Sequence, residues 1–262
     1  MRGFLVTLFG VRLAVASDSA VMAEALDRYV LPWLPRSALG AEPVDRRIEV
    51  RGTARSSGFE ILVDGAVAHA SPDPIAAIPA VQRALEDAIV RGQRDVAVVH
   101  GGVVGHAGRV VLLPGSTGAG KSTLVAELVR QGATYFSDEY ALVDAEGRAH
   151  PYPRPLFLRD GPGDGRPVLA SDLGGAVARE PAPVGLVLEL RYAPGAALVL
   201  RAVPQGEGVL SLLRNTPQAL VDEPWILGRL ERAVAGAACY AGPRGEAREA
   251  APGILRLAAA RA

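Results

Sequence analysis

Residues 115–123 combine glycines with a lysine and hydroxyl side chains at the spacing of a phosphate-binding loop. The segment reads Gly115, Ser116, Thr117, Gly118, Ala119, Gly120, Lys121, Ser122 and Thr123, and its first eight residues match the pattern GxxxxGK[ST]. Glycines permit positive φ, which lets backbone N–H groups turn inward around phosphate oxygens. Lys121 would reach the β- and γ-phosphates, and the Ser122 hydroxyl would ligate Mg²⁺. We therefore predict that residues 115–123 form a P-loop that binds ATP with Mg²⁺.

The flanking elements have the order that a P-loop requires. Residues 109–113 are a short β-branched and aliphatic run that predicts a strand. After the loop, apolar residues recur at helical spacing over 124–129, and Gly132 stands where a C-terminal cap is expected. A chance glycine-rich turn would lack this strand–loop–helix context.

The neighbouring carboxylates Asp138 and Glu139 follow one short helix after the loop. Phosphoryl transfer needs a metal-bound phosphate and, when a hydroxyl attacks, a carboxylate near that hydroxyl. Adjacent strand residues point to opposite faces, so both can serve one site only at a strand end or a bulge. One carboxylate would then bind Mg²⁺ and the other would serve the acceptor. The alternative is a solvated pair in a turn.

His100 ends a β-branched run that begins at Val96, and it would lie beside Asp138 if their strands were neighbours. A lone histidine is more often a satisfied core residue, so this alternative stays open. Arg154 and Arg159 could contact phosphate, although solvated arginines are the commoner case.

Composition narrows the class of protein and its partners. The 262 residues carry 28 basic and 28 acidic side chains, which removes the electrostatic argument for nucleic acid or an anionic membrane as the main partner. Cys239 is the only cysteine, so no internal disulfide forms, and a reducing, cytoplasmic location is expected. Residues 1–16 resemble a signal peptide, but Arg12 and Gly10 favour an edge hairpin.

Hairpin signals surround the P-loop, which predicts an α/β fold with a mixed, largely antiparallel sheet. We expect an N-terminal α/β accessory region over 1–95 and a P-loop domain over 96–262. Residues 160–183 are rich in glycine and proline and predict either a surface loop or a lid. Residues 187–191 and 197–201 flank Pro194-Gly195 and predict another hairpin.

The combination of His100-Gly101, the loop from Gly115 to Ser122 and the pair Asp138-Glu139 resembles the kinase domain of bacterial HPr kinase/phosphorylase. The resemblance implies a P-loop kinase fold related to phosphoenolpyruvate carboxykinase, and ATP-dependent phosphorylation of a serine hydroxyl. It assigns Asp138 as the catalytic base with His100 as its neighbour, Lys121 as a phosphate ligand, and Ser122 and Glu139 as magnesium ligands.

Departures from the family indicate a divergent member. Glu139 replaces an aspartate, and Thr123 stands where the family commonly has glutamate. The family's later Arg-Gly-x-Gly segment, which is associated with the reverse, dephosphorylating reaction, has no counterpart in this sequence. The N-terminal 95 residues also differ from the family's usual N-terminal domain. The chain resembles divergent kinases of this group, some of which modify peptides made by biosynthetic clusters.

We therefore predict a kinase that phosphorylates a serine, or another hydroxyl, of a peptide or small protein. The sequence leaves the oligomeric state open, with a homo-oligomer as one possibility. Three alternatives remain: a P-loop ATPase or nucleotide-dependent switch, a kinase of a small-molecule hydroxyl, and a degenerate ATP-binding module. Intact Lys121, Ser122 and Asp138 speak against the last.

Overall fold

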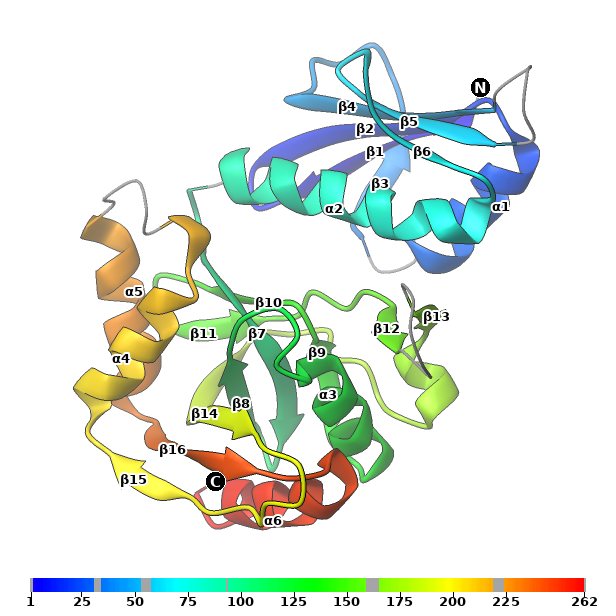
Figure 1. Ribbon diagram of the computed structural model, residues 1–262. Helices are drawn as coiled ribbons and strands as arrows, with labels where there is room; N and C mark the ends of the chain where they lie inside the picture. The colour runs from blue at the N-terminus through cyan, green and yellow to red at the C-terminus, as the bar shows by residue number, and fades with distance from the viewer. Residues whose placement is uncertain are drawn as a thin grey trace. The chain divides into compact units, whose positions relative to one another are not determined.

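The computed structural model describes residues 2–30, 34–52, 58–92, 94–158, 165–218 and 224–261 (Figure 1). The chain divides into two compact units, one of residues 1–95 with 159–167 and one of residues 96–158 with 168–262. Of the described residues, 165–167 are grouped with the first unit, whereas the sequence prediction counted them in the domain of residues 96–262. The predicted loop or lid at 160–183 lies partly outside the described residues, since 159–164 are not among them.

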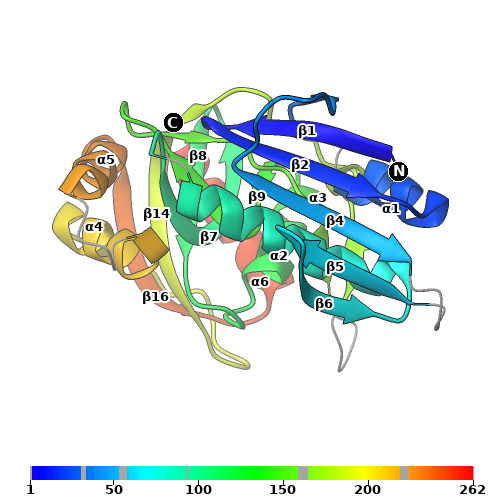
Figure 2. The same cartoon turned by 90° about the horizontal axis from the view of Figure 1, so that it is seen from above.

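The first unit is a six-stranded sheet with two helices on one face (Figures 1 and 2). The strand order is β3-β1-β2-β4-β5-β6, and only β2 and β4 run parallel. The elements are β1 (Arg2–Leu8), β2 (Val11–Ser17), α1 (Ala20–Tyr29), β3 (Arg36–Ala38), β4 (Arg46–Gly52), β5 (Phe59–Val63), β6 (Ala66–Ser71) and α2 (Pro74–Gly92). The predicted N-terminal hairpin is confirmed as β1–β2, although it does not lie at the edge because β3 pairs with β1.

The second unit contains an eight-stranded sheet in the order β11-β10-β7-β8-β14-β16-β15, with β9 also pairing with β7. The strands are β7 (Ala97–His106), β8 (Arg109–Pro114), β9 (Thr134–Ser137), β10 (Tyr140–Val143), β11 (Arg148–His150), β14 (Ala182–Tyr192), β15 (Arg201–Val203) and β16 (Ala238–Arg244). Parallel pairs join β8 to β14 and β14 to β16, and the other pairs are antiparallel. The predicted α/β fold with a mixed, largely antiparallel sheet is confirmed.

Helices cover both faces of this sheet (Figures 1 and 2). They are α3 (Lys121–Arg130), α4 (Gln205–Arg214), α5 (Pro224–Ala235) and α6 (Ala247–Ala259), and the unit also contains a 3₁₀ turn η1 (Ala170–Leu173) and the short strand β12 (Leu156–Leu158). The short strand β13 (Arg166–Val168) begins in the range of the first unit and ends in that of the second. One core cluster contains residues of α3 and α6, and the other contains residues of α4 and α5.

Helix α3 packs unusually closely on β7 because Gly102 has no side chain. A Cβ at this position would lie 2.6 Å from Val125 Cγ2, inside van der Waals contact. The close approach fixes the start of α3 against the strand that carries His100. None of the helices in the described part of the chain is long and apolar enough to span a membrane.

The predicted hairpin around Pro194-Gly195 is wrong. Strand β16 lies between β14 and β15, pairing parallel with β14 and antiparallel with β15. Residues 196–200 form no strand, and the Val199 N–H donates instead to the Pro243 carbonyl at 3.1 Å. The local pattern is that of two strands and a turn, but a strand from much later in the chain takes the place of the expected partner.

Candidate functional site

The loop of residues 115–120 connects the end of β8 to the start of α3, as the motif predicts. Gly118 and Gly120 have φ of 86° and 74°, backbone angles that residues with a Cβ rarely adopt. Gly120 is the N-cap of α3, and no side chain caps the helix there. The first-turn N–H groups of α3 are thus left without a side-chain cap, and with the helix dipole they form a ready site for an anion.

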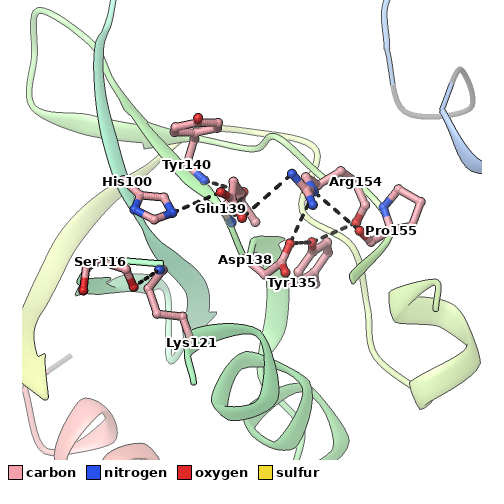
Figure 3. A network of polar contacts seen from close by, with 10 residues as sticks. His100, Ser116, Lys121, Tyr135, Asp138, Glu139, Tyr140, Arg154 and Pro155 are labelled. Atoms are coloured by element: carbon pink, nitrogen blue, oxygen red, sulfur yellow. Dashed lines mark hydrogen bonds and ion pairs between the residues drawn. The ribbon is translucent and has the colours of Figure 1, made fainter. Parts of the chain in front are cut away.

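Lys121 lies at the first position of α3 and folds back over the loop. Its Nζ donates to the Ser116 carbonyl at 2.9 Å (Figure 3). Burial lowers the pKa of the Lys121 amine, while the negative charges of Glu139 and Asp138 act in the opposite direction. The ammonium group therefore lies within electrostatic reach of both carboxylates.

Asp138 and Glu139 form the bend between β9 and β10, opposite the middle of β7. The Ser137 hydroxyl oxygen accepts the backbone N–H of Glu139 at 3.3 Å and that of Tyr140 at 3.1 Å, which stabilises the bend. The condition that the sequence set for both carboxylates to serve one site, a strand end or a bulge, is therefore met. The bend frees both side chains from strict alternation, and both approach Arg154 (Figure 3).

Asp138 is buried, with its side chain 1% exposed. Its Oδ1 lies 3.1 Å from the Tyr135 hydroxyl, which is also 2.8 Å from the Arg154 carbonyl, so one proton is shared between two acceptors. Its Oδ2 is buried and has no partner in hydrogen-bonding geometry among the described residues. Burial raises the pKa of Asp138, while the Arg154 charge and the Ser122 hydroxyl act to lower it.

Glu139 has different surroundings. Its Oε1 lies 3.0 Å from His100 Nε2, and its Oε2 lies 3.9 Å from Arg154 Nη1. Burial acts to raise the pKa of Glu139, but the His100 hydrogen bond and the Arg154 charge outweigh it, and the pKa is lowered. The resemblance placed His100 beside Asp138, whereas the hydrogen bond of the imidazole is to Glu139.

Strand β7 brings these groups together through its backbone. The His100 carbonyl accepts the N–H of Gly115, the first residue of the loop, at 3.3 Å. The next N–H, that of Gly101, donates to the Glu139 carbonyl at 2.9 Å. The loop and the acidic bend are therefore held by adjacent residues of one strand.

Sequence reasoning missed two side chains of this site. It left Arg154 open between a phosphate contact and a solvated side chain and did not connect it to the acidic pair, yet this side chain is 13% exposed, with Nε 3.6 Å from Asp138 Oδ1. It treated Tyr135 as an ordinary strand residue, although its hydroxyl contacts Asp138. A usable signal was the placement of Arg154 between Pro153 and Pro155, since prolines on both sides restrict the backbone that presents it.

An open cavity of about 780 Å³ adjoins the loop within the second unit. Its volume is in the range of small-molecule sites. Residues of the loop form one wall, and the other walls come from β14, β15, α4 and β16. Charged and aromatic side chains in the lining are Glu189, Arg191, Tyr192, Arg201 and Arg214.

The oxygen donors near Ser122 suit a hard cation. Within the described ranges no group of three or more histidine, cysteine or carboxylate side chains converges as a metal site. Mg²⁺ bound with a nucleotide is held through one or two carboxylates, because phosphates and water complete its octahedral shell. The carboxylates of Asp138 and Glu139, with the Ser122 hydroxyl, fit that requirement.

No known family model matches the sequence, and no curated protein matches it significantly. A function for this chain is therefore inferred from the motif spacing and from the geometry described above.

Proposed function

We propose that this protein is a Mg²⁺- and ATP-dependent kinase similar to HPr kinase, which transfers the γ-phosphate to a serine or another hydroxyl of a peptide or small protein. The observation that carries the proposal is the buried carboxylate of Asp138, which lies within reach of the Ser122 hydroxyl at the start of α3 and whose Oδ2 has no hydrogen-bond partner among the described residues. A carboxylate close to an uncapped, glycine-rich helix start is what transfer to a hydroxyl requires.

The phosphate-binding groups would be the N–H groups of the loop and the Lys121 amine. The N-terminus of α3 offers uncapped N–H groups and a positive dipole end to the phosphates. Lys121 would exchange its hydrogen bond to the Ser116 carbonyl for one to a phosphate oxygen. The nucleoside would then lie in the adjoining cavity, where Tyr192 and several arginines line the wall.

The two carboxylates divide the remaining tasks. A raised pKa suits Asp138 to accept the proton of the attacking hydroxyl, because a base works best with a pKa nearer the operating pH. A lowered pKa keeps Glu139 ionised, and its hydrogen bond to His100 fixes the carboxylate. Mg²⁺, held by Ser122 and Glu139, would supply neutralising charge to the phosphates. ATP dependence and the lone buried Cys239 support a cytoplasmic location.

The test is a transfer assay with γ-labelled ATP and Mg²⁺, with and without peptides encoded beside the gene. Label on a serine of a peptide is the expected result. ADP and free phosphate without labelled peptide would favour an ATPase or switch, and label on a small molecule would favour a small-molecule kinase. Failure of the protein to bind ATP would overturn the proposal.

A further inference from the structure

Arg244, the last residue of β16, carries a buried guanidinium that reaches the loop from outside the motif. The residue is 3% exposed. Its Nη2 lies 2.9 Å from the Gly120 carbonyl and 3.2 Å from the Ala119 carbonyl, and its Nη1 donates to the Gly245 carbonyl at 2.9 Å. The roles proposed above do not use this side chain.

The two loop carbonyls that Arg244 contacts determine where two N–H groups point. A trans peptide group is planar, and its C=O and N–H bonds point in opposite directions. Holding the carbonyls of Ala119 and Gly120 towards β16 therefore directs the N–H groups of Gly120 and Lys121 away from it. Those two N–H groups stand at the uncapped start of α3, where an anion would bind.

Neighbouring residues keep Arg244 in this position. A Cβ on Gly120 would lie 2.7 Å from Arg244 Nη2, so a side chain there would push the guanidinium away. On its other side the guanidinium lies over the Tyr192 ring, 5.2 Å from the centroid. The Tyr192 hydroxyl in turn donates to Glu246 Oε1 at 2.7 Å. An arginine keeps its charge when buried, so the group also adds positive potential next to the loop.

We propose that Arg244 is a positioning residue, which fixes the loop so that the N–H groups of Gly120 and Lys121 face a polyphosphate. The identity of that ligand rests on the proposed function, whereas the ordering of the loop does not. The experiment therefore measures the order of the loop amides and the binding of the ligand separately.

The first readout is the ¹⁵N order parameter of the Gly118, Gly120 and Lys121 amides in the free protein. We expect values near the rigid-backbone level of about 0.85 in the wild type, and below about 0.6 in Arg244→Met. Arg244→Lys, which keeps the charge but not the planar fork, should lie between them. A folded Arg244→Met with unchanged order parameters would overturn the proposal.

Two further variants separate a local effect from general destabilisation. Gly120→Ala displaces the guanidinium from the loop side and also strains the backbone at its φ of 74°, so both causes should loosen the same amides even if Arg244→Met does not fold. Unchanged loop order in a folded Gly120→Ala would count equally against the proposal. Ile226→Ala is the control, since Ile226 is a buried residue of α5 in the other core cluster, and it should leave the loop amides rigid.

The second readout is calorimetric binding of ATP with Mg²⁺. We expect Arg244→Met to weaken ATP binding about tenfold or more, because the N–H groups of Gly120 and Lys121 are no longer held towards the phosphates. A change of about tenfold is the size expected for the loss of one charge-assisted hydrogen bond. Ile226→Ala should bind as the wild type does. If the wild type binds no ATP while Arg244→Met loosens the loop, the proposed function fails and the positioning role stands. If the wild type binds ATP and Arg244→Met binds it equally well, the positioning role fails.

Discussion

Two clusters of the second unit combine a histidine with acidic side chains, and they differ in how fully the buried aspartate of each is hydrogen-bonded. His150 Nε2 lies 2.9 Å from Asp144 Oδ2 in the turn between β10 and β11. Asp144 Oδ1 accepts the N–H groups of Glu146 and Arg148 at 3.0 and 2.8 Å, and its Oδ2 also accepts Arg148 Nε at 2.9 Å. Both oxygens of this carboxylate serve to hold a turn.

The pair formed by His100 and Glu139 has nearly the same separation, 3.0 Å, but beside it lies Asp138 with a buried oxygen that has no partner in the described structure. Buried polar atoms in folded proteins are nearly always bonded, so an exception needs an explanation. Residue types do not distinguish the two clusters. The hydrogen bonding of their oxygens does: it is complete at Asp144, which holds a turn, and incomplete at Asp138, for which we propose a role in phosphate transfer.

The largest expected effect is on phosphate transfer. Asp138→Asn should lower the rate of transfer by about 10²- to 10⁴-fold, the usual contribution of a general base, with ATP still bound. Asp144→Asn should transfer at close to the wild-type rate, because that side chain only supports a turn. Single-turnover transfer from labelled ATP measures both. Equal losses in the two variants would remove the distinction between the clusters.

Lys121→Ala should weaken the binding of ATP. Loss of a charged hydrogen bond of about 1.5–3 kcal/mol corresponds to about a 10- to 150-fold rise in the Kd for ATP. Calorimetric titration with ATP and Mg²⁺ measures this, with Asp144→Asn as the matched control. An unchanged Kd for Lys121→Ala would mean that the loop does not bind the phosphates in the way proposed.

The elements that depend on neighbouring residues could be predicted from the sequence alone. The loop from Gly115 to Gly120 and the helix after it are encoded by residues within one short window, where glycine conformation and apolar spacing decide the structure. The rule that adjacent strand residues point to opposite faces gave the condition for Asp138 and Glu139 to share a site, but it did not by itself predict the break between β9 and β10. The interposition of β16 between β14 and β15 could not be predicted, because strand pairing over long sequence separations is decided by tertiary packing.

The same limit applies to the side chains around the acidic pair. Arg154 lies in a segment without regular structure, and Arg244 lies on a strand near the end of the second unit, so no periodic pattern connects either one to the loop. Tyr135 reaches Asp138 because the bend lets a residue three positions earlier fold against it. Long, flexible or non-local side chains complete the site, and their positions follow from the fold.

A smaller effect is expected at Glu139. Glu139→Gln keeps the shape of the side chain and removes its charge, so it should raise the Mg²⁺ concentration for half-maximal transfer about tenfold. ATP saturation curves at several Mg²⁺ concentrations measure this. If Asp138→Asn, and not Glu139→Gln, changes the Mg²⁺ requirement, the roles of the two carboxylates are exchanged, as the closeness of the Asp138 carboxylate to the Ser122 hydroxyl would also allow.

The last expected effect is on stability and not on transfer or binding, and here the two aspartates should have opposite signs. The pKa of Asp138 is raised by burial, so the folded state favours its protonated form. The stability that this provides is present below the ordinary value of 3.8 and is lost as pH rises through the raised pKa. Asp138→Asn should therefore be more stable than the wild type at pH 8, and the difference should shrink on acidification.

Asp144 should behave in the reverse way. Burial acts to raise its pKa, but hydrogen bonds from the Arg148 backbone, His150 and the Arg148 side chain outweigh it and lower the pKa. Its stabilisation is present above 3.8 and is lost as pH falls through the lowered pKa. Asp144→Asn should cost about 1–3 kcal/mol at neutral pH, the penalty for disrupting bonds of a buried charged group. Thermal unfolding of both variants between pH 3 and 8 measures the signs, and a destabilised Asp138→Asn at pH 8 would show that its carboxylate is as well bonded as that of Asp144.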